Sequence, residues 1–342
     1  MRNKILLGVL IIGVAIGTWR QQGRSAQDTS ILTARKVAKG PALDGKIDAL
    51  WQQAQAVKIP LMGGANLPNG GTEVTLKAVY TDTDVFFLAQ WGDKSQSLQR
   101  FPWKKQADGS WVRLVDPGDK GNDSNMYYED KLAILWNINI AGFEAAGCMV
   151  ACHAGESGKP YGNKYLNNPG ELGDLWHWKS VRTGPVGQID DQYVDSTRYD
   201  KDKSPDAGRK SDPKTAGGYV DNFSDDKKGP KFAAKGNKPA PPYWILDQEK
   251  EAFDNSKYKT GDEVASILVA AFTGDRGDIG AQASWENGVW TLEFSRKLTT
   301  AGKSDVQFDD LSKQYAFGVA VFDNAQVRHA FATVPNKLAF AK

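Results

Sequence analysis

Alternating hydrophobic and polar positions recur along the chain and predict a protein built mainly from β-strands. Val74, Leu76 and Ala78 fall on one side of such an alternation, which is the pattern of a half-buried strand. A turn at 81–84 separates this strand from a second apolar run at 85–91, so the pair predicts a β-hairpin. Apolar or alternating patterns predict further strands at 131–140, 266–272, 288–294, 315–322 and 326–334.

These strands predict a mainly β fold, an antiparallel β-sandwich with long loop insertions and short helices. The 35 glycines, 15 prolines and 11 tryptophans agree with turns and packed aromatic sheets. Residues 200–242 are dominated by Lys, Asp, Gly and Pro and show no lasting apolar period. Such a stretch has little apolar surface to bury, so we expect a polar surface insertion within one domain that spans residues 27–342.

The N-terminal segment indicates export. Arg2 and Lys4 precede an almost wholly apolar stretch at 5–16, which is shorter than the roughly 20 residues of a membrane-spanning helix. A polar stretch follows, as in secretory signals. We therefore expect residues 1–26 to be a signal peptide or an N-terminal membrane anchor. The remainder would then be periplasmic, either soluble or tethered by this segment.

The charge balance and the cysteine count exclude two classes of protein. The 43 basic and 41 acidic residues nearly cancel, which argues against a nucleic-acid-binding protein. A small secreted domain stabilised by disulfides would carry more than two cysteines, at wider spacings. We therefore expect the two cysteines to have a chemical role and not to stabilise the fold as a disulfide.

The segment Cys148-Met-Val-Ala-Cys152-His153 is typical of covalent haem attachment. Two thiols add to the two vinyl groups of a haem, and the adjacent imidazole reaches the iron from the same side. The common motif has two residues between the cysteines, and here there are three. A disulfide would close only a very small loop, a zinc site would need more ligands, and a redox dithiol usually has the shorter spacing. We therefore expect one covalent haem c, with His153 as an axial ligand of its iron.

The second axial position has several candidates. His177 lies between Trp176 and Trp178, which could form a wall of the haem pocket, and His329 lies on the predicted return strand. The pattern alone does not choose between these histidines. The methionine candidates are Met126 and Met62, whereas Met149 belongs to the attachment segment and so to the proximal side.

Several further motifs resemble those of one known family. They are 43–45 with Trp51, 85–91 with Asp93, 174–179 (Asp-Leu-Trp-His-Trp-Lys), 288–291 and 319–323. With these motifs the chain resembles the haem-binding γ subunits of ethylbenzene dehydrogenase and related molybdenum enzymes of the dimethyl-sulfoxide-reductase type. The Trp-His-Trp-Lys block is the most specific of them, and the resemblance covers nearly all of the exported part.

The resemblance implies a β-sandwich that holds one haem, at the loop end, and passes electrons. In the γ subunits the haem is of b type and is held by methionine and lysine, so the Cys148–His153 segment is a departure that makes this a c-type branch. The position that matches the family's lysine ligand is His329, which implies axial ligation by His153 and His329. The resemblance makes His177 a pocket residue, and the neighbouring Lys179 and Arg182 could pair with the haem propionates.

The sequence thus predicts a monohaem c-type cytochrome that acts in periplasmic electron transfer. Its expected partners are redox proteins, among them a molybdenum enzyme or a membrane quinol-oxidising complex. One alternative is a haem-containing redox enzyme or gas sensor with an open distal site. Another is a carbohydrate-binding β-sandwich, which would leave the cysteine motif unexplained.

Overall fold

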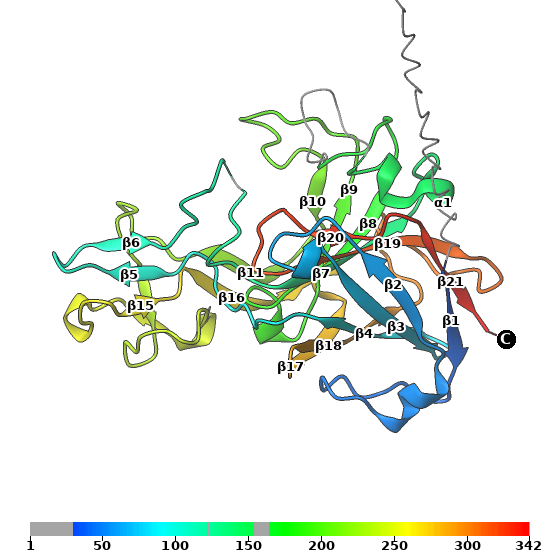
Figure 1. Ribbon diagram of the computed structural model, residues 1–342, viewed down its shortest axis with the longest axis horizontal. Coiled ribbons are helices and arrows are strands. Elements are labelled where there is room, and N and C mark those ends of the chain that lie inside the picture. The colour runs from blue at the N-terminus through cyan, green and yellow to red at the C-terminus, as the bar shows by residue number, and fades with distance from the viewer. Residues whose placement is uncertain (1–29, 122, 154–163, 342) are drawn as a thin grey trace, which may run out of the picture.

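Two β-sheets face each other in the larger part of the computed structural model, which describes residues 30–121, 123–153 and 164–341 (Figure 1). The expected signal or anchor segment at 1–26 lies outside the described residues. The first sheet contains, in spatial order, β10 (Arg209–Ser211), β9 (Asp190–Val194), β8 (Gly173–Lys179), β7 (Lys131–Asn137), β19 (Tyr315–Phe322) and β21 (Asn336–Phe340). The second contains β3 (Thr72–Tyr80), β4 (Asp84–Gly92), β18 (Val289–Lys297) and β17 (Gly280–Glu286), with β2 (Val57–Leu61) beside β3.

Strand β1 (Ile31–Lys36) joins the two sheets. Its first residues pair with β21 and its last two pair with β3, so one continuous 13-stranded sheet folds over on itself. At the opposite edge, the Ile189 N–H donates to the Ile279 carbonyl, which brings the start of β9 to the start of β17. The two-residue strand β20 (Ala330–Phe331) pairs with Ala320 and Val321 of β19, farther along the edge that β21 pairs with at Tyr315–Phe317.

The core between the sheets is strongly aromatic. Phe87 of β4 stacks on Phe294 of β18 with 5.0 Å between ring centroids, and Trp136 of β7 lies 5.1 Å from Trp176 of β8. All four side chains are fully buried. Because alternate residues of a strand point to opposite faces, the neighbours of these residues on β7 and β8 face outward, and that outer face carries the candidate site.

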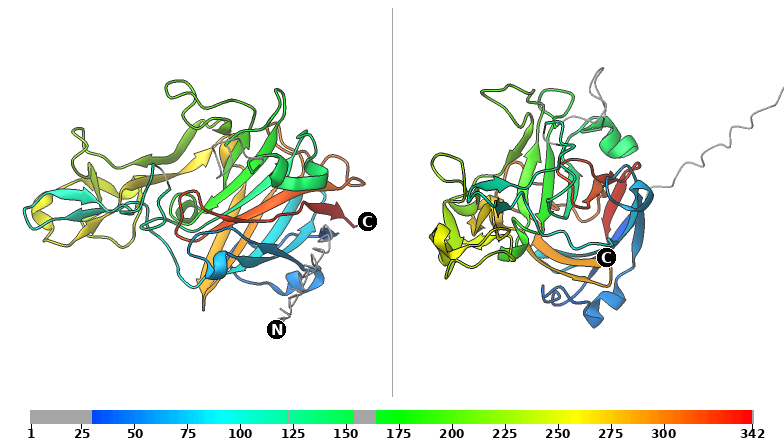
Figure 2. Two further views of the ribbon diagram at one scale, coloured as in Figure 1. Left: turned by 45° about the horizontal axis from the view of Figure 1, so that its top comes forward. Right: turned by 60° about the vertical axis from the view of Figure 1, so that its left-hand side comes forward.

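A smaller lobe of short strands extends from one end of the sandwich, at the left of Figure 1, and both views of Figure 2 show it set apart from the two large sheets. It contains β11 (Ala216–Asp221), β16 (Ile267–Thr273), β13 (Ile245–Leu246), β12 (Phe232–Ala234), β14 (Lys250–Ala252), β15 (Glu263–Val264), β5 (Trp103–Lys105) and β6 (Trp111–Arg113). The helices are α1 (Phe143–Ala146) and the 3-10 turns η1 (Ala49–Gln53), η2 (Pro68–Gly70), η3 (Gly147–Val150), η4 (Gly184–Val186), η5 (Asp247–Glu249), η6 (Asn255–Lys257) and η7 (Asp275–Gly277). Within the described ranges, no helix is both long and apolar enough to cross a membrane.

The structure confirms the predicted sandwich-like β fold and most of its predicted strands. The hairpin at 74–91 is β3 and β4, which pair antiparallel, and the run at 315–322 coincides with β19. The strand predicted at 131–140 ends at Asn137, because the Asn137 side chain accepts a hydrogen bond from the Ile140 N–H and turns the chain.

Two other segments differ from their prediction. The return strand predicted at 326–334 is reduced to β20, because the His329 N–H bonds to the nearby Val327 carbonyl instead of to a neighbouring strand. The polar segment 200–242 is more ordered than its composition suggests. It supplies β10 to the first sheet and β11 and β12 to the smaller lobe.

Candidate functional site

Two glycines shape the segment that carries the cysteines. Gly142 begins α1 and Gly147 ends it, and both have positive φ (76° and 55°), which favours glycine. A Cβ at Gly147 would also lie 3.2 Å from the Pro335 backbone, so the chain passes close to the approach to β21 at this point. The segment thereby leaves the end of β7 and folds back over the outer face of the first sheet.

Both cysteines pack on that outer face. Cys148 and Cys152 lie in an apolar cluster with Leu135 of β7 and Leu175 of β8. The Cys148 sulfur lies directly over Gly318 of β19, where any Cβ would overlap it. The two thiols form no disulfide, and burial raises the pKa of both, that of Cys152 to about 11. Such thiols are neutral at pH 7, unlike the activated thiolates of redox dithiols.

His153 and His329 face each other across the site. Their Nε2 atoms are 3.0 Å apart, although the residues are 176 positions apart in the sequence. The His153 N–H bonds to the Cys148 carbonyl, so the histidine is tied to the cysteine segment. His329 comes from the turn that precedes β20, on the other side of the site. The structure thus brings together the two histidines that the sequence analysis names as axial ligands.

Backbone and ring contacts hold both imidazoles in this orientation. The Nδ1 atom of His329 lies 2.8 Å from the Val327 carbonyl, to which it donates as the N–H tautomer, so its Nε2 lone pair is directed at His153. The His153 ring stacks on Phe331 with 3.8 Å between centroids, and Phe322 lies 4.6 Å from His329. Such fixed tautomers and ring planes are typical of histidines that bind metals.

Both imidazoles are in the form that binds a metal. Burial lowers the pKa of His153 to about 4, and burial together with the nearby His153 lowers the pKa of His329 to about 3. At neutral pH each ring therefore keeps a lone pair on one nitrogen, which is the donor that a metal requires.

His177 lies beside this pair without joining it. It projects from β8 onto the same outer face as Leu175, and its ring stacks on Phe322 at 5.6 Å. Its Nδ1 is 3.1 Å from the Gln192 side-chain oxygen, and its buried Nε2 has no hydrogen-bond partner among the described residues. Phe322 therefore contacts both His177 and His329, which fits the pocket position that the resemblance implies for His177.

The tryptophans on either side of His177 point the other way. Trp176 and Trp178 are 0% and 1% exposed and belong to the core between the sheets. Since they alternate with Leu175 and His177 along β8, they lie on the face opposite Cys148. The structure does not bring these two indoles to the side of the sheet where the cysteines and His329 meet.

Lys179 and Arg182 are both engaged by buried carboxylates. The Lys179 ammonium pairs with Asp190, and the Arg182 guanidinium pairs with Glu129. Both carboxylates are 0% exposed. Each cation therefore has a structural partner already, and a contact with haem propionates stays a prediction for both.

The methionine candidates lie at the surface. Met62 is 54% exposed and Met126 is 48% exposed, while Met149, which lies between the two cysteines, is 42% exposed. Met62 pairs with Phe331 only through its backbone. None of these three thioethers is held in the site in the way that the imidazoles are.

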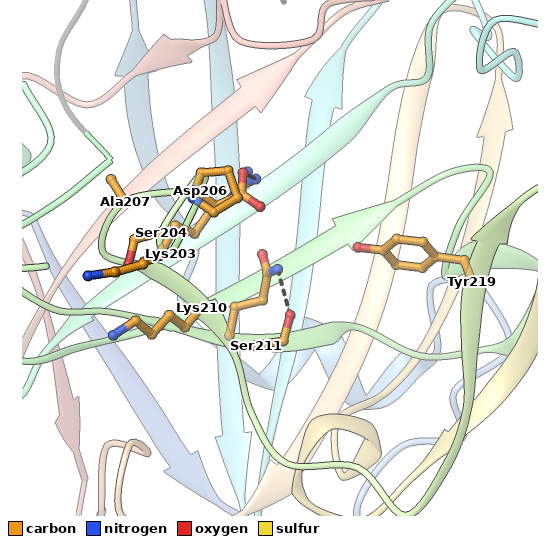
Figure 3. Close-up of a pocket in the computed structure, with 10 residues that line it drawn as sticks. Lys203, Ser204, Asp206, Ala207, Lys210, Ser211 and Tyr219 are labelled. Carbon is orange, nitrogen blue, oxygen red and sulfur yellow. Dashed lines mark hydrogen bonds and ion pairs between the residues drawn. The ribbon is translucent and has the colours of Figure 1, made fainter. Parts of the chain in front are cut away.

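A polar pocket of about 350 Å³ adjoins the site beyond His177 (Figure 3). Gln192 lines it while also contacting His177, and its side-chain nitrogen donates to the Ser211 hydroxyl. Figure 3 shows Tyr219 on one side of this pocket and the Lys203–Ala207 loop on the other. Its lining residues are Gln192, Lys203, Ser204, Pro205, Asp206, Ala207, Arg209, Lys210, Ser211 and Tyr219.

Sequence reasoning missed three residues of this site. Gly318 gives room for Cys148, and its signal was a glycine inside a strand, which often marks a close approach. Phe322 and Phe331 contact the two histidines, but their hydrophobic patterns are the same as those of core residues.

Comparisons with known proteins identify the family. The solved structures that resemble this one include a family 9 carbohydrate-binding module from Caldicellulosiruptor kristjanssonii, in complexes with glucose and with cellotriose. For both complexes the identity is 8%, the TM-score is 0.35 and 91% of this chain is covered, with 94% and 93% of the other chain. A Bacteroides uniformis structure described as carbohydrate-binding shares 8% identity at a TM-score of 0.34, over 92% of this chain and 100% of that one.

A search of curated protein sequences finds no match to this chain. The sequence model of the family described as ethylbenzene dehydrogenase, however, matches residues 48–333. This match includes most strands of both large sheets, the segment from Cys148 to His153, and His329. The chain therefore belongs to the ethylbenzene dehydrogenase family.

Proposed function

We propose that this chain is a c-type cytochrome that carries electrons through one haem. Cys148 and Cys152 would hold the haem covalently, and His153 and His329 would ligate its iron. The observation that carries the proposal is the approach of the two Nε2 atoms to 3.0 Å, next to two free and half-buried thiols. A haem with two imidazole ligands supplies one-electron chemistry at a six-coordinate iron.

The residues present fit such a group in their donor chemistry. The two neutral imidazoles meet at their Nε2 atoms, where the His153 Nε2–H donates to the His329 lone pair. With the His153 proton moved to Nδ1, both Nε2 atoms would be free to bind a metal, and bonds of about 2.0 Å to a first-row metal would need roughly 4 Å between the nitrogens. The observed 3.0 Å is shorter than this. Since His329 lies in a turn and not in a long strand, a shift of roughly 1 Å requires no break in the sheet ladder.

The chain's own residues would each have a definite task. Gly318 keeps the Cys148 sulfur against the sheet, and the Val327 carbonyl fixes the ring of His329. Phe331 and Phe322 exclude water from the two imidazoles. The hydrogen bond of His177 to Gln192 would adjust the polarity of the pocket, a known influence on redox potential.

The position of His329 favours an electron carrier over an enzyme or gas sensor. An open distal site would require that neither His329 nor His177 reach the iron, but His329 faces His153 directly. A carbonyl-binding assay on the reduced protein tests this distinction. A carrier should bind carbon monoxide slowly or not at all, because the gas must displace an imidazole.

The proposal also includes where the protein acts and which proteins exchange electrons with it. The apolar N-terminal stretch after Arg2 and Lys4 supports export to the periplasm, where the chain would be either soluble or tethered. As partners we propose redox proteins, which include a molybdenum oxidoreductase or a membrane quinol-oxidising complex. Membership of the ethylbenzene dehydrogenase family supports the first of these.

Two histidine variants test the ligand assignment. The His329→Met variant should keep a low-spin spectrum but shift to a higher potential, because methionine ligation generally raises it. The His177→Ala variant should stay low-spin with at most a modest change in potential. Optical and electron paramagnetic resonance spectra distinguish these results.

The same spectra can refute the assignment. If the His177→Ala variant becomes high-spin while the His329→Met variant behaves as the parent, the distal ligand is His177. If both variants keep the parent spectrum, the ligand is neither histidine, and the role given to the facing pair is wrong.

A further inference from the structure

A second cluster of ionisable side chains lies at the edge where the two sheets meet, apart from the histidine pair. Asp191 belongs to β9, Asp278 follows η7 and Asp305 lies in the loop between β18 and β19. One carboxylate oxygen from each lies within 4.8 Å of the others. Three segments that are distant in sequence thus place their carboxylate groups close together.

The most deeply placed of these carboxylates lacks an N–H or hydroxyl donor within the described part of the chain. Asp191 is 0% exposed, and neither of its oxygens accepts a hydrogen bond from a described N–H or O–H group. One oxygen of Asp305 and one of the neighbouring Asp212 are also buried without a donor. Since buried polar atoms are nearly always hydrogen-bonded, several such oxygens together call for a ligand with positive charge.

The described residues supply too little positive charge to neutralise these carboxylates. Arg296 is the cation that reaches it, but its guanidinium bonds to Asp174 at 3.0 Å and to the Val306 carbonyl. It lies 3.9 Å from Asp305. Asp174 and Asp212 add two more buried carboxyl groups beside the three, so among the described residues the acidic side chains here outnumber this one guanidinium.

We propose that Asp191, Asp278 and Asp305 bind a calcium ion. Calcium takes six to eight oxygen ligands at about 2.3–2.6 Å, so ligands on opposite sides of one ion are about 4.6–5.2 Å apart. The three oxygens lie within 4.8 Å of one another, close enough to bind a single ion of this kind. The donors are all oxygens, without the nitrogen or sulfur ligands that zinc prefers. Asp278 is exposed, so the ion can reach the site from solvent.

A second acidic cluster provides the natural comparison. Asp93, Asp130 and Asp323 are also close together and buried. Both oxygens of Asp130, however, accept hydrogen bonds, from the Ser97 and Asn324 N–H groups and from the Trp290 indole, while Ser95 donates to Asp93 and Asp323. These hydrogen-bond donors compensate much of the negative charge of the Asp93 cluster, so the proposal is confined to the Asp191 cluster.

The location of the ion suggests its task. It would join β9 of the first sheet to the start of β17 in the second and to the loop before β19. This edge is held by few backbone bonds, among them the one from Ile189 to Ile279. The ion would therefore act as a structural clamp on the sandwich, independent of any haem.

The experiment measures calcium binding and melting temperature of the purified full chain. After treatment with EGTA, calcium should raise the melting temperature, and isothermal titration should give one site per chain. Terbium should bind in its place and show luminescence excited through tryptophan, because Trp176 donates to Asp174 beside the site. Magnesium at the same concentration should give a smaller shift.

Two substitutions locate the ion, and a third is the matched control. Asp191→Asn and the exposed Asp278→Asn should each weaken calcium binding at least tenfold, whereas Asp93→Asn should leave it unchanged. In EGTA the Asp191→Asn variant should melt above the parent, because it removes charge repulsion, and calcium should reverse that order. A merely structural role of Asp191 would not reverse it.

Three results would overturn the proposal. One is the absence of calcium binding to the EGTA-treated parent, which would mean that Asp191 and Asp278 relieve their repulsion by sharing a proton. Another is calcium binding that survives both cluster substitutions. The third is calcium binding that is lost in Asp93→Asn, which would place the ion in the other cluster.

Discussion

The contact between Cys148 and Gly318 allows a sharp test of the attachment site. The Cys148 sulfur occupies the space where a side chain at position 318 would lie. A Gly318→Ala substitution adds one methyl group, but that group would overlap the sulfur. The cysteine segment or β19 must then move.

The cost follows from the packing. Inserting a methyl group into a filled core typically costs about 1–3 kcal/mol. For a domain of this size each kcal/mol lowers Tm by about 2–4 °C, so we expect a loss of about 2–12 °C. Because Cys148 would be displaced, we also expect a fraction of the protein to carry haem through Cys152 alone.

Two measurements report these effects separately. Thermal unfolding gives the loss of stability, and the absorption band of the reduced, denatured protein gives the attachment, since an unreacted vinyl group moves this band to longer wavelength. Gly92→Ala is the matched control, because Gly92 also lies in a strand and its added Cβ would meet nothing closer than 3.7 Å. If Gly318→Ala keeps the parent's stability and both thioether links, the described contact between Cys148 and β19 is wrong.

Two further predictions concern buried carboxyl groups. Burial alone would raise the pKa of Asp190, but Lys179 and Arg276 outweigh burial and hold this pKa below its usual range. The ionised Asp190 carboxylate therefore stabilises the fold above about pH 4, and this stabilisation is lost as the pH falls further. Asp190→Asn leaves both cations buried without a charged partner and should cost about 3–5 kcal/mol in chemical denaturation at pH 7. Asp84→Asn should change little, because its ion pair with the exposed Lys297 is only partly buried. Burial raises the pKa of Asp93 to about 7, so the folded state binds its proton more tightly and stability falls as the pH rises towards that value. Asp93→Asn should therefore match the parent near about pH 3, and should exceed its unfolding free energy by a margin that grows between about pH 4 and pH 7. A gap that is independent of pH would contradict this assignment.

Much of the fold is visible in local patterns of the sequence. Strands such as β3 and β19 have one buried face, so their alternation marks both their position and their orientation. The segment 200–242 is different, because β10 and β11 gain their order from pairing with β9 and β16. Pairing between distant strands leaves no trace in a local hydrophobic pattern.

Some residues of the candidate site can likewise be recognised in the sequence, and others cannot. The Cys148, Cys152 and His153 motif is contiguous, so the sequence shows it directly. The approach of His329 depends on a turn before β20 and was suggested only by the resemblance to a family. The direction of Trp176 and Trp178 was misjudged, because neighbours of a residue in a strand point to the opposite face.

The acidic cluster around Asp191 could not be seen in the sequence at all. Its members come from β9, from the turn after η7 and from the loop before β19. No spacing rule connects them, because the two sheets must first close on each other. The sequence gives only aspartates in polar surroundings, which are common in loops.

Covalent haem on the full chain is the most direct test of the proposed function. The protein should be exported from a host that matures c-type cytochromes, denatured, extracted with acidified organic solvent and weighed by mass spectrometry. The account predicts one haem retained per chain, and its loss when both Cys148 and Cys152 are replaced by alanine. A chain that releases its haem into the solvent, or that carries none while folded, would contradict it.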